Sequence, residues 1–188
     1  MDGEDARIAG CAAGLFHAHG ITATGVDALA RAAGVSKRTL YQRFGSKDGL
    51  IAAAYEALDL PVFEMFTRPA EAAGPSGEAQ LDGFFARLEE LVRLPEFRGC
   101  PFSNAAAELA DPGHPAHAVV RRHKARIAGW IRERAVMTGA RDPDGLARAL
   151  MLVFAGAQVQ AVVEGSPQPA RDARTLARRL VHEAAPPP

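Results

Sequence analysis

The sequence contains few cysteines and no excess of either charge. Only Cys11 and Cys100 occur among its 188 residues, and their wide separation argues against a disulfide scaffold or a cysteine-based zinc site. Lys and Arg total 22 and Asp and Glu total 22, so the formal net charge is zero. A neutral protein does not bind polyanions through its bulk charge, and any nucleic-acid site must therefore be a local patch.

The sequence also lacks the pattern of a membrane span or an export signal. Its longest apolar run, Leu146 to Val163, is interrupted by Arg148, Gln158 and Gln160, which a membrane span rarely contains. The first residues are acidic, whereas a signal peptide begins with basic residues and continues with apolar ones. Apolar residues make up 48% of the chain and charged residues 23%, as in ordinary globular proteins. We therefore expect a cytoplasmic protein without a membrane partner.

Strand signals are nearly absent, because no segment sustains an alternation of apolar and polar residues. Ala and Leu instead recur every three or four residues between Gly and Pro breaks, and this spacing predicts an all-α fold of about nine helices. The stretch 68–77, rich in Pro, Gly and Ala, is expected to be a loop. The expected helices are 4–19, 26–33, 37–44, one that starts after Ser46, 78–94, 103–110, 116–138, 143–164 and 170–184.

Residues 28–41 have the pattern of a helix, a tight turn and a second helix. Gly34 can adopt the turn conformation open to a residue without a Cβ, Val35 fills the space between the helices, and Ser36 caps the second helix. With Leu40 facing inward, polar side chains occupy the N-terminus and outer face of the second helix, where a helix that enters a major groove needs them. These polar residues are Lys37, Arg38, Thr39, Tyr41, Gln42 and Arg43.

The same segment carries positive charge without a counter-charge. The 17 residues from Arg31 to Lys47 include Lys37, Arg38 and Arg43 as well, and no acid. Five cations within a neutral protein indicate a phosphate-binding patch. The alternative is a solvated polar face on a helical core, which charge alone does not exclude.

At these residues the sequence resembles the TetR/AcrR family of one-component transcriptional regulators. The resemblance covers about the first quarter of the chain, and one departure is Gly25, where the family often has Ser or Thr, so that Thr24 or the backbone must cap the second helix. The matching residues are Gly20, Thr24-Gly25-Val26, Leu29-Ala30, Ala33-Gly34-Val35-Ser36, Thr39-Leu40-Tyr41, Phe44, Ser46-Lys47 and Leu50.

The resemblance implies an N-terminal three-helix helix-turn-helix head on a larger helical body. The head, residues 1–48, would bind double-stranded operator DNA, and the body, residues 49–188, would bind a ligand and dimerise. The implied DNA-binding residues are Thr24, Gly25, Ser36, Lys37, Arg38, Thr39, Tyr41, Gln42, Arg43 and Lys47.

Aromatic residues are concentrated in one part of this body, since six of the nine Phe lie from residue 63 to residue 102. We expect them to line an apolar cavity for a small apolar or aromatic effector, although each one alone is more often a core residue. The expected lining is Phe63, Phe66, Phe84, Phe85, Leu88, Phe97, Cys100, Phe102, Trp130 and Phe154, with Asn104, Glu108 and Gln158 as orienting polar groups.

The stretch around Cys100 also resembles a pattern within the family. Gly99-Cys100 followed by Asn104 and Glu108 is similar to the Gly-Cys-x-x-x-Asn-x-x-x-Glu stretch of the LmrA/YxaF-like subgroup. Asn104 and Glu108 are four residues apart and would share one helical face. We interpret Cys100 as a buried wall of the cavity, with a redox-sensing thiol as the alternative.

The helix 143–164 is apolar on all sides and must therefore bury two faces, one on the body and one on a partner subunit. With the last helix it would form half of a four-helix dimer interface. A two-fold dimer also suits a near-palindromic operator with half-sites one turn apart, roughly 34 Å. The expected interface residues are Ala149, Leu152, Val153, Gly156, Val159, Gln160, Val163, Leu176 and Leu180.

The sequence therefore predicts a homodimeric, sequence-specific DNA-binding regulator, a repressor released by a small-molecule effector, with no catalytic residue, cofactor or metal. One alternative is a small helical metal-assisted enzyme that uses Glu108 with His114 and His117. The other is an adaptor whose basic head binds an acidic protein. Neither explains the turn, the cap and the cation spacing together.

Overall fold

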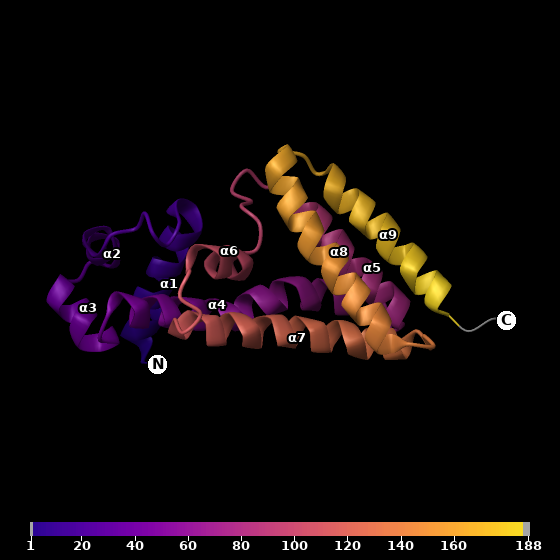
Figure 1. Ribbon diagram of the computed structural model, residues 1–188, viewed down its shortest axis with the longest axis horizontal. Helices are drawn as coiled ribbons and strands as arrows, with labels where there is room; N and C mark the ends of the chain where they lie inside the picture. Colours follow the sequence, from indigo (N-terminus) through magenta and orange to yellow (C-terminus); the bar gives the residue numbers. More distant parts are fainter. Residues whose placement is uncertain (1, 186–188) are drawn as a thin grey trace. The chain divides into compact units, whose positions relative to one another are not determined.

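The computed structural model describes residues 2–185, which form nine α-helices and no β-strand (Figure 1). The predicted all-α fold and the number of helices are confirmed. The helices are α1 Gly3–His19, α2 Val26–Ala33, α3 Lys37–Phe44, α4 Lys47–Ala72, α5 Gly77–Leu91, α6 Pro101–Glu108, α7 Pro115–Met137, α8 Pro143–Glu164 and α9 Gln168–Ala184.

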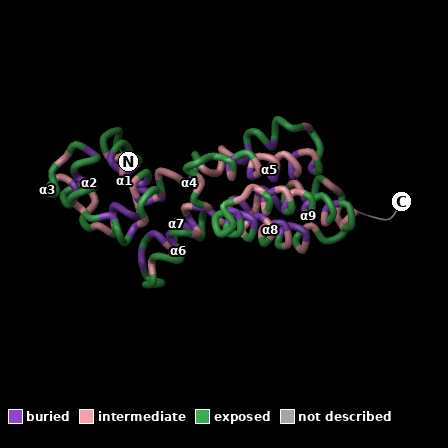
Figure 2. The backbone as a smooth tube through the Cα atoms, turned by 90° about the horizontal axis from the view of Figure 1, so that it is seen from above, coloured by how far each residue is buried: buried purple, intermediate pink, exposed green. Residues whose placement is uncertain are grey.

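These residues divide into two compact units. The first comprises 2–62 and 101–123, and the second comprises 63–100 and 124–185. Helices α4 and α7 therefore each contribute to both units. In both units the buried positions follow the inner sides of the helices and the exposed positions follow the outer sides (Figure 2).

In the first unit, α1 supplies the core on which α2 and α3 are built. Its residues Ile8 and Phe16 are buried, and α2 packs against it. Gly34 ends α2 in the left-handed conformation, with φ 64° and ψ 32°. The Ser36 hydroxyl then accepts a 3.0 Å hydrogen bond from the amide of Thr39 and caps α3. The turn thus has the glycine and the cap that the sequence predicts.

A buried polar pair lies between α4 and α7 in the same unit. His123 Nδ1 is 2.9 Å from a carboxylate oxygen of Asp59, and both residues are almost fully buried. The His123 ring is stacked on Phe102 of α6, with 3.7 Å between centroids, and Tyr55 meets Phe102 edge-on. This stack joins α4, α6 and α7 within the first unit.

The second unit has an aromatic core. Phe84 of α5 is fully buried, and its ring contacts Phe66 of α4, Trp130 of α7 and Phe154 of α8 at centroid distances of 4.7 to 5.3 Å. Helix α9 packs along both α5 and α8, and Figure 1 shows these three helices side by side. Tilted and stacked ring contacts of this kind add to the stabilisation that burial gives.

The predicted loop at residues 68–77 is largely wrong. Helix α4 continues through Pro69 to Ala72, and only residues 73–76 separate it from α5. Ala70 is fully buried, and a Cβ on Gly83 of α5 would lie 2.8 Å from the Cβ of Ala73. This close packing of α4 on α5 stabilises the helix despite the proline, whose effect on a helix depends on the surrounding packing.

Candidate functional site

The outer side of α3 presents the polar residues that the sequence predicts for the nucleic-acid interface. Leu40 is buried on the inner side of the helix, whereas the side of α3 away from it is exposed. Thr39 is half-buried, and its hydroxyl lies 2.8 Å from the Ser36 hydroxyl. The exposed residues are Lys37, Arg38, Tyr41, Gln42 and Arg43.

The first turn of α2 is left open to an anion. Gly25 is the N-cap and provides no side-chain hydrogen bond. Thr24 does not replace it, because Thr24 is buried and its hydroxyl donates a 2.6 Å hydrogen bond to the carbonyl of Gly20. Of the two possibilities that the sequence left open, the backbone amides at the start of α2 are therefore the groups that can meet a phosphate oxygen.

Groups outside the cationic segment contact two of its lysines. Lys37 Nζ is 2.6 Å from a carboxylate oxygen of Asp27, and Lys47 Nζ donates a 3.1 Å hydrogen bond to the carbonyl of Ile21. Arg31 and Arg38 are exposed and make no ion pair with any residue in the described range. The patch is therefore less positive than its 17-residue sequence alone indicates.

Arg43 contacts three acidic side chains. Its guanidinium donates hydrogen bonds to Asp5 at 2.7 Å and to Asp2 at 3.2 Å, and it also contacts Glu4. The hydrogen bond with Asp5 raises the pKa of Arg43 above its ordinary value. The amide of Asp5 and the Arg43 guanidinium together lower the pKa of Asp2. Arg43 thus contacts the start of α1, unlike the other exposed residues of α3.

The structure places Glu108 with the helix-turn-helix region. Its carboxylate, at the end of α6, accepts hydrogen bonds from the backbone amides of Ile21 at 2.7 Å and Thr22 at 3.1 Å. These partners are 87 and 86 residues away in the chain, so no local pattern could have found the contact. Asn104, one turn earlier on α6, is exposed.

Most of the predicted effector-binding aromatics meet in the second unit. One buried cluster contains six of the predicted residues: Phe66, Phe84, Phe85, Leu88, Trp130 and Phe154. Phe63 and Phe97 are partly exposed and pack against this cluster. Gln158 is buried, and its side-chain amide donates to the carbonyl of Phe154 on its own helix. Phe102 is not in this cluster, because it lies in the first unit.

Cys100 is buried in the second unit and has a cation beside it. Lys124 Nζ donates to the Cys100 sulfur at 3.3 Å. The sequence around Cys100 does not reveal this cation, because Lys124 is 24 residues away on α7. The contact holds the residue before α6 against α7.

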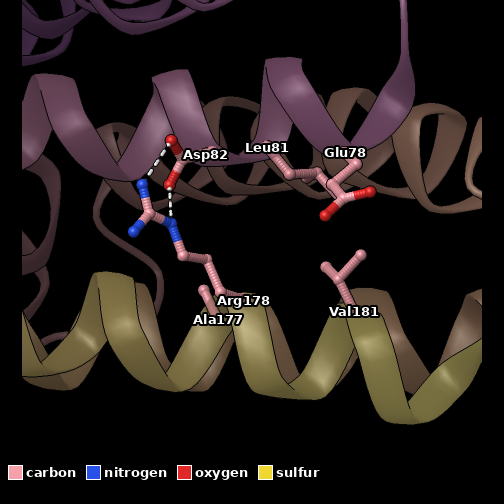
Figure 3. Close-up of a pocket in the computed structure, with 6 residues that line it drawn as sticks. All are labelled: Glu78, Leu81, Asp82, Ala177, Arg178 and Val181. Atoms are coloured by element: carbon pink, nitrogen blue, oxygen red, sulfur yellow. Dashed lines mark hydrogen bonds and ion pairs between the residues drawn. The ribbon is translucent and has the colours of Figure 1, made fainter.

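A small hollow between α5 and α9 is bounded by an ion pair. It has room for about 10 Å³, roughly one water molecule. The Asp82 carboxylate at its edge is paired with Arg178 (Figure 3). It is also paired with Arg174. The lining consists of Glu78, Leu81, Asp82, Ala177, Arg178 and Val181. The hollow is too small for an organic effector. None of its lining residues is among those that the sequence predicts to bind an effector.

One side of α8 is apolar and exposed. Leu152 is 76% exposed, Val159 58% and Val163 74%, and they follow the three- and four-residue spacing of one helix face together with exposed Gly156 and Gln160. On α9, Leu176 is exposed. Val162 is also exposed, although the sequence interpretation did not include it. Ala149, Val153 and Leu180 are half-buried, and the last two pack against the core.

By length and composition alone, α8 is the one helix within residues 2–185 that could span a membrane. Its other side, however, carries Leu150 and Phe154, which are buried in the core of the second unit. Burial of one side against protein is typical of a core helix with a second face left for a partner.

The residues of the enzymatic alternative bind backbone groups. His114 Nδ1 accepts a 3.1 Å hydrogen bond from the amide of Ala116, and His117 Nε2 is 2.9 Å from the carbonyl of Leu109. Glu108 binds the two amides described above. Among residues 2–185, no three His, Cys, Asp or Glu side chains are grouped so as to hold a metal ion.

Comparison with known proteins gives two family matches. The family model described as bacterial regulatory proteins, tetR family, matches residues 11–54, which contain α2, α3 and the turn between them. The model described as tetracyclin repressor-like, C-terminal domain, matches residues 77–177. The two models together cover most of the chain.

Individual relatives agree with these matches. The transcriptional regulator AcuR of Cereibacter sphaeroides is 30% identical over 184 residues, which span 90% of this chain and 82% of that protein. The HTH-type transcriptional regulator YjdC of Escherichia coli is 27% identical over 109 residues, which span 58% of this chain and only 57% of that protein. A solved structure of a tetR-type transcriptional regulator from Streptomyces avermitilis is 36% identical, covers 97% of this chain and 98% of that one, and has a TM-score of 0.86.

Proposed function

Since the chain belongs to the TetR family of bacterial transcriptional regulators and carries the DNA-binding domain of that family, we propose that it is a homodimeric repressor released from its operator by a small molecule. The observation that carries the proposal is the exposed polar side of α3, set at a fixed angle by Gly34 and Ser36. A capped helix with such a side is what a major groove receives.

The side chains of α3 suggest a division of roles on the DNA. Arg38 and Lys37 suit guanine edges and phosphates, and Gln42 suits adenine. Tyr41, Lys47 and the uncapped amides at the start of α2 would bind the phosphate backbone and set the register of the head. Arg43 is the least suited to a direct contact, because Asp2, Glu4 and Asp5 already bind its guanidinium.

A homodimer is supported by the apolar side of α8. Leu152, Val159 and Val163 would be costly to leave in water, and a second copy of the same face is the partner that two-fold symmetry supplies. Leu176 extends this face onto α9. Such a dimer would present two heads to the two halves of a near-palindromic operator.

The second unit is the proposed effector-binding region. Its match to a tetracyclin repressor-like C-terminal domain supports both this role and the repressor assignment. An effector would enter the apolar region around Phe84 and Phe154 by displacing their ring contacts. It would release the DNA only if it bound the non-binding conformation more tightly than the binding one. We expect the protein to act in the cytoplasm, where the operator is.

An electrophoretic titration of the promoter DNA beside the protein's own gene tests the proposal. The wild type should bind this DNA specifically and in a salt-sensitive way, and the double variant Lys37→Ala/Arg38→Ala should lose the binding with an unchanged helical spectrum. The matched control, Arg68→Ala/Arg171→Ala, removes two exposed or half-buried cations outside the head and should bind like the wild type. Equal binding by the two double variants would contradict the assigned role of α3.

A further inference from the structure

The turn between α1 and α2 is held by side chains from two later helices. The amides of Ile21 and Thr22 donate to the Glu108 carboxylate of α6, at 2.7 and 3.1 Å. The carbonyl of Ile21 accepts from Lys47 Nζ of α4 at 3.1 Å. Both backbone groups of Ile21, a residue only 2% exposed, therefore bind charged side chains from elsewhere in the chain, and its carbonyl also accepts a 3.3 Å hydrogen bond from the amide of Thr24.

The position of Glu108 on its own helix is unfavourable without these partners. It is the last residue of α6, and a carboxylate at a helix C-terminus lies next to the negative end of the helix dipole. A part-buried hydrogen bond from the Ile21 amide and an exposed one from the Thr22 amide compensate for that position. Glu108 therefore serves the α1–α2 turn and not its own helix.

Gly20 makes room for the carboxylate. Its φ is +86°, a conformation that other residues rarely adopt, and a Cβ built on it would lie 3.1 Å from Glu108 Oε2. Gly20 is also the C-cap of α1. The position therefore favours glycine for two reasons, the end of α1 and the approach of the Glu108 carboxylate.

The segment that follows α6 also approaches the start of α4. His114 Nδ1 accepts a hydrogen bond from the Ala116 amide. His114 Nε2 is 3.4 Å from a carboxylate oxygen of Asp48 in the first turn of α4, without a hydrogen bond between them. The segment between α6 and α7 thus meets the α1–α2 turn through Glu108 and the start of α4 through His114. All of these residues belong to the first unit.

We propose that Glu108 is a positioning residue for DNA recognition. It fixes the α1–α2 turn, and with it the uncapped start of α2, in the place from which α2 and α3 meet the DNA together. Withdrawal of α6 leaves the amide of buried Ile21 without an acceptor, so the position of α6 and the order of the head are coupled. This role rests on the proposed DNA-binding function and adds to it a residue outside residues 1–48 on which the order of the head depends.

The sign of the effect separates positioning from electrostatics. Removing an acid that lies beside the DNA-binding head strengthens DNA binding if charge alone matters, because repulsion from the phosphates falls. Positioning predicts the opposite for Glu108→Ala, a weakening of about tenfold, as expected for losing hydrogen bonds to a charged group. The slope of affinity against salt should not change, because no cation is removed. Glu108→Gln keeps an oxygen acceptor and should bind between the wild type and Glu108→Ala.

The experiment measures promoter-DNA affinity and amide hydrogen exchange on the same full-length proteins. Glu96→Ala is the matched control, because Glu96 is an exposed acid in the second unit. In Glu108→Ala, exchange at Ile21 and Thr22 should rise about tenfold or more while Glu96→Ala behaves like the wild type. If Glu108→Ala does not fold, Glu108→Gln carries the same comparison with a smaller expected change.

The outcomes separate this role from the proposed function. Unchanged exchange at Ile21 and Thr22 would overturn the contact, and raised exchange with unchanged or tighter DNA binding would overturn the positioning role. In both cases the wild type still binds specific DNA, and the proposed function stands. A wild type that binds no specific DNA would overturn the proposed function, and the role of Glu108 with it.

Discussion

Arg43 on α3 donates a 2.7 Å hydrogen bond to Asp5 of α1, although the two residues are 38 positions apart. Asp2 and Glu4 contact the same guanidinium, so the acidic start of the chain covers one cation of the helix proposed to read DNA. The contact links α1 to α3 and also competes with DNA phosphates for Arg43. Its removal therefore has a measurable consequence.

The triple variant Asp2→Asn/Glu4→Gln/Asp5→Asn should bind DNA several-fold more tightly at low salt. It removes three negative charges from the head and frees Arg43, which adds about 0.9 to the slope of log affinity against log salt if Arg43 then meets a phosphate. Asn at position 2 can still cap α1. Titrations at several salt concentrations measure both quantities.

The control for this variant neutralises three acids outside the head, Glu78, Glu96 and Glu133, each to Gln. It should leave affinity and salt slope near those of the wild type, since these residues lie in the second unit. Weaker DNA binding by the head variant would show that Arg43 acts mainly as a clamp between α1 and α3.

Gly25→Ser should stabilise the protein by a few tenths of a kcal/mol. The N-cap of α2 has an extended backbone with φ −79°, and a Cβ there would meet no atom within 4 Å, so serine fits and can accept from the first-turn amides. Thermal unfolding measures the gain. A melting temperature below that of the wild type would contradict the structure of this cap.

Leu152→Glu/Val163→Glu should convert the proposed dimer to a monomer. The two carboxylates would lie within the exposed apolar side of α8, where burial against a second copy would leave both charges unpaired. Light scattering after gel filtration gives the mass, and circular dichroism checks the helix content.

The control for the dimer variant is Val136→Glu, at an exposed apolar position on α7 that is not part of this side of α8. It should remain a dimer. A double variant that keeps the mass of the wild type would show that the interface lies elsewhere.

Asp82→Asn should lower the stability at neutral pH by about 1 kcal/mol, or roughly 2–4 °C in Tm, because it breaks the pairing of α5 with α9. Hydrogen bonds from Arg174, opposed in part by burial, and a further one from Arg178 hold the pKa of Asp82 far below its ordinary value of 3.8. A carboxyl whose pKa is lowered by folding stabilises the protein above its ordinary pKa and loses that contribution as the pH falls toward the lowered one.

The difference in Tm between the wild type and Asp82→Asn should therefore stay constant above about pH 5 and shrink as the pH falls below about 4. Thermal unfolding of both proteins across this range measures it. A difference that grows on acidification would contradict the ion pair as its source.

The local parts of the fold could be predicted from the sequence, and the long-range contacts could not. Gly34 and Ser36 act on their immediate neighbours, so their residue types were enough to predict the turn and the cap. Pro69 was taken as part of a loop because propensity cannot weigh the packing of Ala70 and Ala73 against Gly83.

The same distinction holds for the site. The outward position of Lys37, Arg38 and Gln42 follows from helical periodicity, which the sequence displays. The acids that bind Arg43 and the amides that bind Glu108 come from distant segments, and only the folded chain brings them together. The sequence interpretation consequently overestimated the free charge of the head and assigned Glu108 to the effector.

Hydroxyl-radical footprinting of the promoter DNA tests the central claim most directly. A symmetric pair of heads should protect two segments one helical turn apart, roughly 34 Å, and Lys37→Ala/Arg38→Ala should protect neither at the same concentration. A single protected segment, uniform protection, or an unchanged footprint with the double variant would contradict the account of α3 as the helix that reads DNA, once in each subunit.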